Sequence, residues 1–485
     1  MKNQVHLIAY VNRLAEGGIK KLQKLLESQL SDIFGGVHLL PFFYPIDGAD
    51  AGFDPIDHTL VDYRLGSWED IKQLSEVTDV MADVIVNHVS AQSPQFLDFL
   101  ERGETSTYTD LFLTMSSVFP NGATEKELIS IYRPRPGFPF TTISLKNGDK
   151  RILWTTFTSN QIDIDVTCDA GKSYLNSILE KFYQSGIKII RLDAAGYAIK
   201  KAGTSCFMIP ETFEFIDWFR NKASTYGIEV LVEIHSYYKK QIEIAQKVDW
   251  VYDFALPPLI LHAIFKKTSF YIKKWLEISP RNAITVLDTH DGIGVIDIGS
   301  SGSEEGLIPN EDIDALVKQI HINSKGESKQ ATGKAASNLD LYQINCTYFD
   351  ALGGNEEYYL IARAIQFFAP GIPQVYYMGL LAEKNDMHLL NTTNVGRDIN
   401  RHYFTSDEVE IALDKSVVKR LIHLIKFRNE HPAFNGNFSI GKTSDDKLEL
   451  IWINNSERAI LTVNFATFKL SIVYTEDNKE QHFTL

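Results

Sequence analysis

The chain has 485 residues, of which 44% are apolar and 12% aromatic. This composition can fill sizeable cores and is typical of a globular protein of roughly two to four domains. The formal net charge of −14 argues against nucleic acid or an anionic membrane as a partner, because both require clustered Lys and Arg, and the basic pairs of this chain are scattered.

The cysteines and the N-terminal residues favour a cytoplasmic protein. Cys168, Cys206 and Cys346 lie far apart without the spacing of a metal site, and their odd number is most simply explained by free thiols in a reducing compartment. The first apolar run is interrupted by Asn12 and Arg13, and no cleavage site of small residues follows it. Because no apolar run reaches about eighteen residues either, we expect an unprocessed cytoplasmic protein without a membrane span.

Short apolar runs rich in β-branched residues recur along the chain, and most of them precede a segment with helical periodicity. The runs are 5–11, 36–42, 83–89, 187–194, 229–235, 249–257, 283–290 and 372–379. The helical segments between them are 18–34, 68–78, 171–185, 211–226, 310–322 and 357–369. Alternation of strand and helix eight times predicts an α/β protein built on a (β/α)8 TIM barrel.

Two connections are too long for ordinary loops and are expected to be insertions on the catalytic face of the barrel. The first contains the aromatic and Pro-rich run 132–140, and the second contains the polar run 324–338, which we expect to be mobile in the free protein. Alternating runs at 447–453, 458–465 and 469–475 predict a small C-terminal antiparallel β-domain. The expected division is barrel 1–87, 167–291 and 357–430, first insertion (domain B) 88–166, second insertion (B′) 292–356, and β-domain 431–485.

Polar and charged side chains gather where four of the predicted strands end. They are Asn87 and His88, Arg191 and Asp193, Glu233 and His235, and His290 and Asp291. Taken alone, Arg191 and Asp193 are equally well explained as a buried ion pair that closes a strand. Because the carboxyl ends of barrel strands meet at one face, the whole set would pack poorly without a ligand. The strand ends therefore predict a single active-site pocket.

Four of these stretches resemble the four sequence regions of the α-amylase superfamily of retaining glycoside hydrolases and transglycosylases. They are DVIVNH (83–88), IIRLDAAG (189–196), VLVEIH (230–235) and VLDTHDG (286–292). More narrowly, residues 41–71, YRPRPGFPF (132–140) and SNLDLYQIN (337–345) are similar to the sucrose phosphorylase family. The resemblance spans nearly the whole chain. It implies reversible, retaining transfer of the glucosyl unit of sucrose to inorganic phosphate, giving glucose 1-phosphate and fructose.

The resemblance also implies the catalytic roles. Retaining transfer requires one carboxylate that attacks the anomeric carbon and a second carboxyl group that protonates the leaving oxygen. Asp193 matches the nucleophile, Glu233 the acid/base, and Asp291 the third carboxylate, which holds the sugar hydroxyls. Arg191 lies two residues before Asp193 on the same face of the strand, so we expect it to lower the pKa of Asp193 and to keep this side chain ionised.

Further positions match substrate contacts of the family. On the glucosyl side these are Asp50, Phe53, His88, His290 and Arg397. On the acceptor side, Arg135 and Tyr342 match contacts to phosphate, and Tyr197, His235 and Gln343 match positions around the fructosyl unit. Taken alone, Phe53 is more simply explained by core packing, and Arg133 is a second candidate cation beside Arg135.

No metal ion or organic cofactor is expected. Asn87 matches a calcium ligand of many amylases, but a structural Asn at a strand end is favoured, because the phosphorylases that this chain resembles do without the metal. The run DIDVTCD (163–169) alternates carboxylates but lacks the Gly and the closing Glu of a calcium loop.

Other functions remain open. A phosphorylase for sucrose 6′-phosphate or glucosylglycerate would differ in the acceptor-side loop alone. A sucrose hydrolase or transglucosylase would release fructose without phosphate. A non-catalytic protein on the same barrel would lack the carboxylates, whereas Asp193, Glu233 and Asp291 are all present. The oligomeric state, monomer or homodimer, also stays open.

Overall fold

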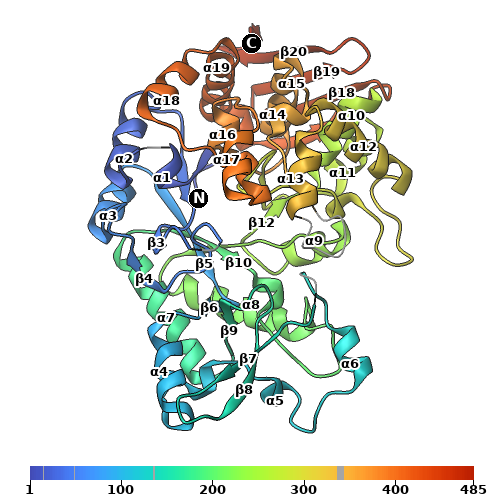
Figure 1. Ribbon diagram of the computed structural model, residues 1–485. Coiled ribbons are helices and arrows are strands. Elements are labelled where there is room, and N and C mark those ends of the chain that lie inside the picture. The colour runs from blue at the N-terminus through green and yellow to red at the C-terminus, as the bar shows by residue number, and fades with distance from the viewer. Residues whose placement is uncertain (15, 49, 135–136, 336–342) are drawn as a thin grey trace.

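Eight parallel strands close into a barrel in the computed structural model, which describes residues 1–485 except 15, 49, 135–136 and 336–342 (Figure 1). The strands follow one another around the barrel in chain order. They are β1 (His6–Ala9), β2 (Gly36–Leu39), β5 (Asp79–Ile85), β10 (Ile189–Asp193), β11 (Glu229–Val232), β12 (Trp250–Asp253), β13 (Ala283–Thr285) and β16 (Ile372–Tyr376). The predicted (β/α)8 barrel is therefore confirmed.

The third barrel strand begins earlier than the sequence pattern indicates. All seven residues of β5 are buried, including Asp79 and Asp83, whereas the predicted run begins at Asp83. Lys188 Nζ lies 3.3 Å from Asp79 Oδ1. The carboxylate of Asp83 lies 2.5 Å from Arg191 Nη1 and 3.0 Å from His38 Nε2. Because partners on neighbouring strands compensate both carboxylates, the run can lie inside a barrel.

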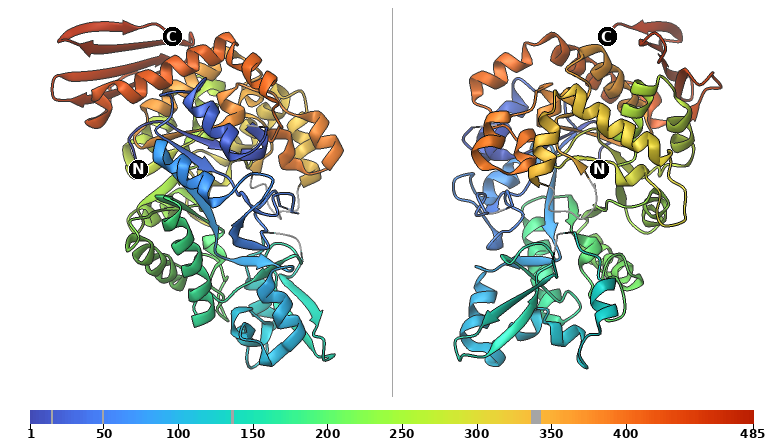
Figure 2. Two further views of the ribbon diagram at one scale, coloured as in Figure 1. Left: turned by 90° about the vertical axis from the view of Figure 1, so that its left-hand side faces the viewer. Right: turned by 45° about the vertical axis from the view of Figure 1, so that its right-hand side comes forward.

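Amphipathic helices lie around the outside of the strands and share one continuous apolar core with them (Figures 1 and 2). They include α1 (Val11–Leu14), α2 (Ile19–Glu27), α3 (Trp68–Val77), α7 (Asp169–Gln184), α8 (Pro210–Ser224), α9 (Tyr238–Ala245), α10 (Leu256–Lys266), α11 (Phe270–Ile278), α15 (Glu356–Phe368) and α19 (Ser416–Glu430). A capping box of Ser67 and Asp70 begins α3, where the sequence predicts a helix start. A short hairpin of β3 (Phe43–Tyr44) and β4 (Asp57–Val61) precedes α3.

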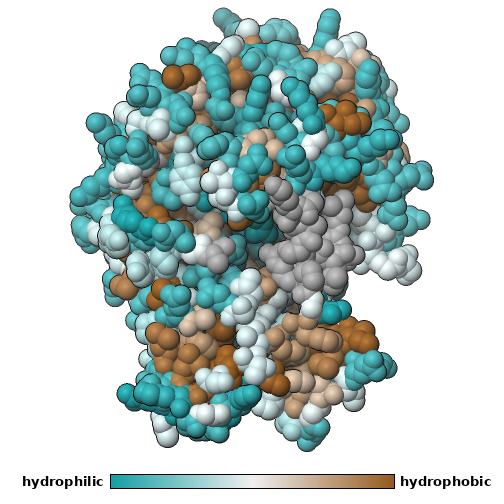
Figure 3. Space-filling model, in the orientation of Figure 1, coloured by the Kyte–Doolittle hydropathy of each residue, from teal (hydrophilic) through white to brown (hydrophobic). Residues whose placement is uncertain are grey.

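The first insertion forms a lobe at the lower end of the molecule in Figure 1. It contains β6 (His88–Ser90), α4 (Pro94–Arg102), η1 (Gly103–Thr105), η2 (Thr109–Leu111), α5 (Met115–Val118), α6 (Glu125–Ser130), β7 (Phe140–Ser144), β8 (Lys150–Trp154) and β9 (Gln161–Asp163). Strand β6 pairs with β9, and β7 pairs with β8, both antiparallel. Part of the lobe has a small core of its own, in which Phe119 stacks on Trp154. Apolar surface gathers on this lobe, where Ile129, Phe138 and Ile152 are exposed (Figure 3).

A buried lysine ties this lobe to the barrel. The Lys200 ammonium group lies 2.8 Å from Asn87 Oδ1, at the end of β5, and 2.8 Å from Asp163 Oδ2 in β9. It also donates to the carbonyl of Tyr197 in η3 (Ala195–Tyr197). The side chains of Lys200 and Asp163 are 2% and 0% exposed. Asn87 thus contacts an internal cation of the chain, which fits the structural role expected of it.

The second insertion corrects one prediction. The polar run 324–338 was expected to be mobile, but residues Glu327–Ala335 form helix α13. The small apolar side chain of Ala331 is buried against Leu390 and Ile399, and Glu327 accepts from Asn385 Nδ2 at 3.0 Å. Ser324 and Ser328 are buried as well, and their hydroxyl groups are hydrogen-bonded to each other at 2.6 Å, so the polar composition of the run concealed contacts that hold the helix in place. Residues 336–338 lie outside the described part of the chain.

The rest of this insertion leads back to the barrel. It comprises β14 (Ile293–Gly294), η4 (Ile296–Ile298), α12 (Asn310–Asn323), β15 (Gln343–Ile344) and α14 (Tyr348–Ala351), and β14 pairs antiparallel with β15. After β16 come α16 (Tyr377–Leu380), α17 (Met387–Thr393), η5 (Gly396–Asn400), α18 (Ser406–Leu413) and, beyond α19, η6 (Pro432–Asn435).

A five-stranded antiparallel sheet ends the chain, as predicted. It contains β17 (Asn437–Ile440), β18 (Lys447–Asn454), β19 (Glu457–Asn464), β20 (Lys469–Glu476) and β21 (Lys479–Phe483). The sequence pattern missed β17 and β21, and β21 is a mostly exposed edge strand without a buried face. Trp452 Nε1 donates to the carbonyl of Phe368 at 2.8 Å and docks the sheet on the barrel. Within the described ranges, no helix is both long enough and apolar enough to cross a membrane.

Substitution of the buried lysine should destabilise the protein. Lys200→Met leaves the Asp163 carboxylate buried without its cation, which costs roughly 3–5 kcal/mol. Thermal unfolding should show a clearly lower Tm, and limited proteolysis should cut the first insertion before the barrel. The matched control is Lys201→Met, since this exposed lysine pairs with Glu211 at the surface and its loss should leave the Tm close to that of the wild type. Equal Tm values for the two variants would contradict the role given to Lys200.

Candidate active site

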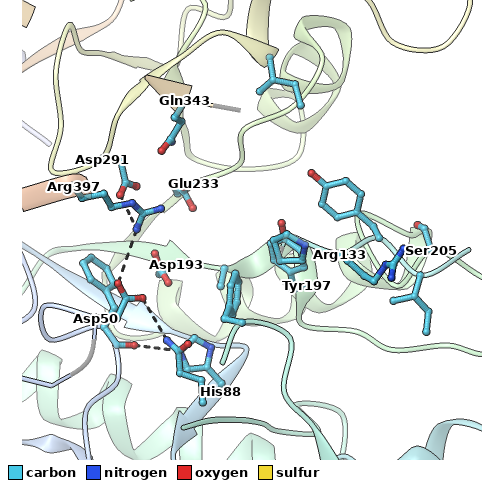
Figure 4. A pocket seen from close by; sticks show the side chains of 18 of the residues that line it. Asp50, His88, Arg133, Asp193, Tyr197, Ser205, Glu233, Asp291, Gln343 and Arg397 are labelled. Atoms are coloured by element: carbon cyan, nitrogen blue, oxygen red, sulfur yellow. Dashed lines mark hydrogen bonds and ion pairs between the residues drawn. The ribbon is translucent and has the colours of Figure 1, made fainter. Parts of the chain in front are cut away.

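A cavity of about 410 Å³ opens where the barrel strands end, beside the first insertion. Its lining includes Asp50, Phe53, His88, Tyr132, Arg133, Phe157, Gln161, Asp193, Tyr197, Ser205, Glu233, His290, Asp291, Gln343 and Arg397. Figure 4 shows Asp50, His88 and Arg397 at one end, and Arg133, Tyr197 and Ser205 at the other, with Asp193 and Glu233 between them. Segments far apart in sequence therefore build one pocket with two ends.

The structure brings together nearly all of the predicted site residues. Ten of the fourteen candidates line the cavity itself: Asp50, Phe53, His88, Asp193, Tyr197, Glu233, His290, Asp291, Gln343 and Arg397. Arg191 and His235 lie directly behind this lining and contact it. The two proposed phosphate contacts, Arg135 and Tyr342, lie outside the described residues.

Arg191 is the centre of a charged cluster that spans three neighbouring strands. Its Nη1 lies 2.5 Å from Asp83 Oδ1 on β5 and 3.0 Å from Asp193 Oδ1 on its own strand. Its Nη2 lies 3.8 Å from Glu233 Oε1, just after β11. The guanidinium group is 3% exposed, so its interactions with these carboxylates are little screened by water. Arg191 thus contacts the carboxylates of both Asp193 and Glu233 from outside the cavity lining.

The net effect on Asp193 differs from the prediction. Burial raises the pKa of Asp193 well above its ordinary value, Arg191 opposes this effect, and the charges of Glu233 and Asp83 add to it. The predicted effect of Arg191 is present, since its charge lowers the pKa of Asp193, but the loss of hydration outweighs one shared guanidinium group, and the pKa of Asp193 is raised overall. Of the two neighbouring carboxyl groups, Asp193 lies nearer to Arg191 than Glu233 does, so the guanidinium charge stabilises the ionised form of Asp193 more strongly.

Asp291 has the opposite electrostatic environment. Its Oδ1 lies 3.0 Å from Arg397 Nη1 and 3.7 Å from Arg401 Nη2, and His290 Nε2 lies 3.8 Å from its Oδ2. Although burial opposes ionisation, the guanidinium groups of Arg397 and Arg401 lower the pKa of Asp291 below its ordinary value. Asp291 is therefore ionised. Nη1 of Arg397 also lies 4.0 Å from Asp50 Oδ1.

The end of the pocket that is predicted to bind the glucosyl unit is lined by neutral histidines. Burial lowers the pKa of both His88 and His290, so neither carries a charge at neutral pH. The ring of His290 stacks on Phe53, with centroids 4.8 Å apart, and His88 Nε2 lies 3.2 Å from the carbonyl of Phe53. Phe53 thus belongs both to the apolar core and to the pocket wall.

Sequence reasoning missed Gln161, which lies at this same end. Its Nε2 is 3.1 Å from His88 Nε2 and 3.4 Å from Asp50 Oδ2. Gln161 belongs to β9 of the first insertion, and the pairing of β9 with β6 carries it to the end of the third barrel strand. No strand-end signal or motif in the sequence marks such a residue.

The end of the pocket that is predicted to bind the acceptor combines a polar pair with an aromatic wall. His235 Nε2 lies 3.7 Å from Glu233 Oε1 and 3.1 Å from Gln343 Nε2. Tyr197 lies 4.7 Å from Phe207 and 5.1 Å from Phe157, measured between ring centroids. Flat rings and polar groups side by side suit a small polar ligand.

The chain matches known proteins over nearly its whole length. The alpha-amylase catalytic domain matches residues 17–257. The chain is 59% identical over 473 residues to a sucrose phosphorylase from Agrobacterium vitis, covering 97% of each chain. It is 56% identical over 465 residues to a sucrose phosphorylase from Bifidobacterium adolescentis, covering 95% of this chain and 92% of that one.

A solved structure agrees with these relatives. The crystal structure of sucrose 6F-phosphate phosphorylase from Thermoanaerobacter thermosaccharolyticum matches with a TM-score of 0.92 and 38% identity, covering 100% of this chain and 98% of that one. Together with a closed barrel whose strand ends carry the three carboxylates, these matches establish that the chain belongs to the sucrose phosphorylase family of the α-amylase superfamily.

Proposed function

We propose that the protein is a sucrose phosphorylase, a retaining hexosyltransferase that transfers the glucosyl unit of sucrose to inorganic phosphate. The products are α-D-glucose 1-phosphate and fructose. The observation that carries the proposal is the arrangement of Asp193 and Glu233 around one buried arginine, in a pocket with a glucosyl end and an acceptor end. The chain's own side chains supply this chemistry, and the proposal includes no metal ion or organic cofactor.

In the first half-reaction, Asp193 attacks the anomeric carbon while the bond from that carbon to the fructosyl oxygen breaks. Glu233 gives its proton to the departing oxygen, and a glucosyl–Asp193 ester forms. The position of Arg191 supports the role of Asp193, because its guanidinium group lies 3.0 Å from Asp193 Oδ1 and stabilises the negative charge that the nucleophile needs.

The glucosyl end stabilises the transition state. Positive charge develops on the sugar ring as the glycosidic bond breaks, and the ionised Asp291 is held at this end by Arg397. His88, His290 and Asp50 offer hydrogen bonds to the sugar hydroxyls, and Phe53 packs against the ring. Because these groups are already fixed by contacts with one another, little reorganisation is required when the sugar binds.

In the second half-reaction, a phosphate oxygen attacks the same carbon from the acceptor side and the ester bond to Asp193 breaks. Glu233, left as a carboxylate, takes up the proton of the acceptor. We assign phosphate binding to Arg135 and Tyr342, and contacts with fructose to Tyr197, His235 and Gln343. The protein is placed in the cytoplasm as part of the same proposal, which its three free cysteines support.

The similarity to a sucrose 6F-phosphate phosphorylase makes one alternative specific. That enzyme would prefer fructose 6-phosphate to fructose in the synthetic direction, starting from glucose 1-phosphate. Rates with the two acceptors, measured at equal concentrations, therefore decide between the two functions, and faster reaction with fructose 6-phosphate would overturn the proposal.

Removal of the nucleophile should abolish turnover without unfolding the barrel. Asp193→Ala loses the covalent route, so phosphorolysis of sucrose should fall below about one per cent of the wild-type rate. The Tm should stay close to that of the wild type, since the substitution removes one partly exposed carboxylate. NMR of the wild-type product should identify the α-anomer of glucose 1-phosphate, and the β-anomer would rule out double displacement.

The acid role of Glu233 depends on the leaving group. Glu233→Gln should slow the cleavage of sucrose by far more than the cleavage of α-glucosyl fluoride, because fluoride leaves without a proton. Release of fructose and of fluoride is measured for the variant and for the wild type under the same conditions. Equal losses on the two donors would show that Glu233 does not act as the acid.

The acceptor side determines how the glucosyl–enzyme is shared between phosphate and water. Arg135→Ala and Tyr342→Ala should each reduce capture by phosphate about ten- to a hundredfold, as expected for a lost charge-assisted hydrogen bond. The ratio of glucose 1-phosphate to glucose is measured across a phosphate titration. Arg133→Ala is the matched control, and a larger effect for this variant would move the phosphate contact from Arg135 to Arg133.

A further inference from the structure

A buried carboxylate behind the acceptor end was not singled out by the sequence. Asp297 in η4 is 0% exposed, and its Oδ2 accepts from His235 Nδ1 at 2.9 Å. Its Oδ1 accepts from the backbone N–H of Ser236 at 3.1 Å and from Gln241 Nε2 at 2.6 Å. Since the opposite nitrogen of His235 faces Glu233 and Gln343, the imidazole ring connects Asp297 to the pocket.

The packing around this pair leaves the ring little freedom. The Phe254 ring stacks on His235, with centroids 3.8 Å apart and planes inclined by 13°. On another side lies Gly294 of β14, where an added Cβ atom would come within 2.5 Å of Asp297 Oδ2 and 3.2 Å of His235 Nδ1. The ring is therefore held in one plane, with Nδ1 toward the buried carboxylate and Nε2 toward the pocket.

Three carboxylates from separate segments face His235. They are Asp297 from η4, Glu233 from the end of β11 and Asp291 from beyond β13, while Phe254 and Gln343 bring no charge. Although burial opposes a charged ring, Asp297 and then Glu233 raise the pKa of His235 above its ordinary value. This contrasts with His88 and His290, whose pKa values are lowered.

The hydrogen bonds of Gln343 indicate where the second proton of His235 can go. Gln343 Oε1 accepts from the backbone N–H of Gly292 at 3.3 Å, which turns its amide nitrogen toward His235 Nε2. In this arrangement His235 Nε2 is an acceptor and the ring carries its proton on Nδ1. Protonation of Nε2 from solvent would replace the acceptor by a donor and create a positive charge at the acceptor end.

We propose that Asp297 is a positioning residue for the acceptor half of the reaction: it keeps a proton on His235 Nδ1, so that a second proton is taken up at Nε2, where it makes the acceptor end cationic for phosphate. Fructose and phosphate occupy this end in turn, and they need different partners. The neutral ring, bonded to Gln343, serves the sugar, whereas the imidazolium serves the anion. This inference rests on the proposed function, which supplies phosphate as the second acceptor.

The test is the pH dependence of phosphate capture. Asp297→Asn keeps the size of the side chain but removes its charge, so the pKa of His235 should fall and the cation should be lost at a lower pH. We expect the alkaline limb of kcat/KM for phosphate to move down by about one pH unit, a tenfold loss on that limb, while hydrolysis of α-glucosyl fluoride changes less than about threefold. Gln241→Met is the matched control, because it removes a contact of Asp297 but leaves its charge, and its pH profile should coincide with that of the wild type.

A second measurement reports the protonation of His235 directly in the wild-type protein. The ring nitrogens of His235 in ¹⁵N-histidine-labelled wild-type protein, assigned with His235→Gln, should show Nδ1 protonated at every pH and Nε2 titrating. Titration at Nδ1, or a wild-type pH profile in a folded Asp297→Asn variant, would overturn the inference. Fructose release from sucrose that is equally fast with and without phosphate would overturn the proposed function instead, and the NMR result would still decide the role of Asp297.

Discussion

The guanidinium group of Arg191, buried among carboxylates from three adjacent barrel strands, is the interaction on which the site depends. The charge of Arg191 compensates two carboxylates, that of Asp83 outside the pocket lining and that of Asp193 in the lining. An uncompensated carboxylate at either position would be costly in the barrel interior, so the same contact serves folding and chemistry. The parallel register of β5, β10 and β11 is what brings these groups to one level.

Burial then separates the behaviour of chemically similar groups. Asp193 and Asp291 lie in one pocket, yet the pKa of the first is raised and that of the second is lowered. The difference is one of partners, since Asp291 contacts Arg397 and Arg401, whereas Asp193 shares its arginine with two other carboxylates. The histidines differ in the same way: the pKa of His235, which contacts the buried carboxylate of Asp297, is raised, whereas the pKa values of His88 and His290 are lowered. Residue type alone therefore does not predict which group is charged.

Buried polar contacts also decide how the insertions meet the barrel. Lys200 connects the end of β5, the loop after β10 and strand β9 through oxygen atoms of all three. On the opposite side, the pairing of β14 with β15 carries Gln343 to His235. The first insertion thus contributes Gln161 to one end of the pocket and Arg133 and Phe157 to the other, where the second insertion adds Gln343. Neither insertion could form its part of the site without the barrel strands that carry the carboxylates.

The sequence by itself determined the barrel, the C-terminal sheet and most of the pocket lining, because strand periodicity and four strand-end motifs are local signals. The contacts of Gln161, Lys200 and Asp297 were decided by the tertiary structure alone. Each depends on a partner far away in the chain, and no local pattern marks it. The net charge state of Asp193 belongs to the same class: the nearby arginine is visible in the sequence, but desolvation depends on everything that packs around the carboxyl group, and this is settled when the chain has folded.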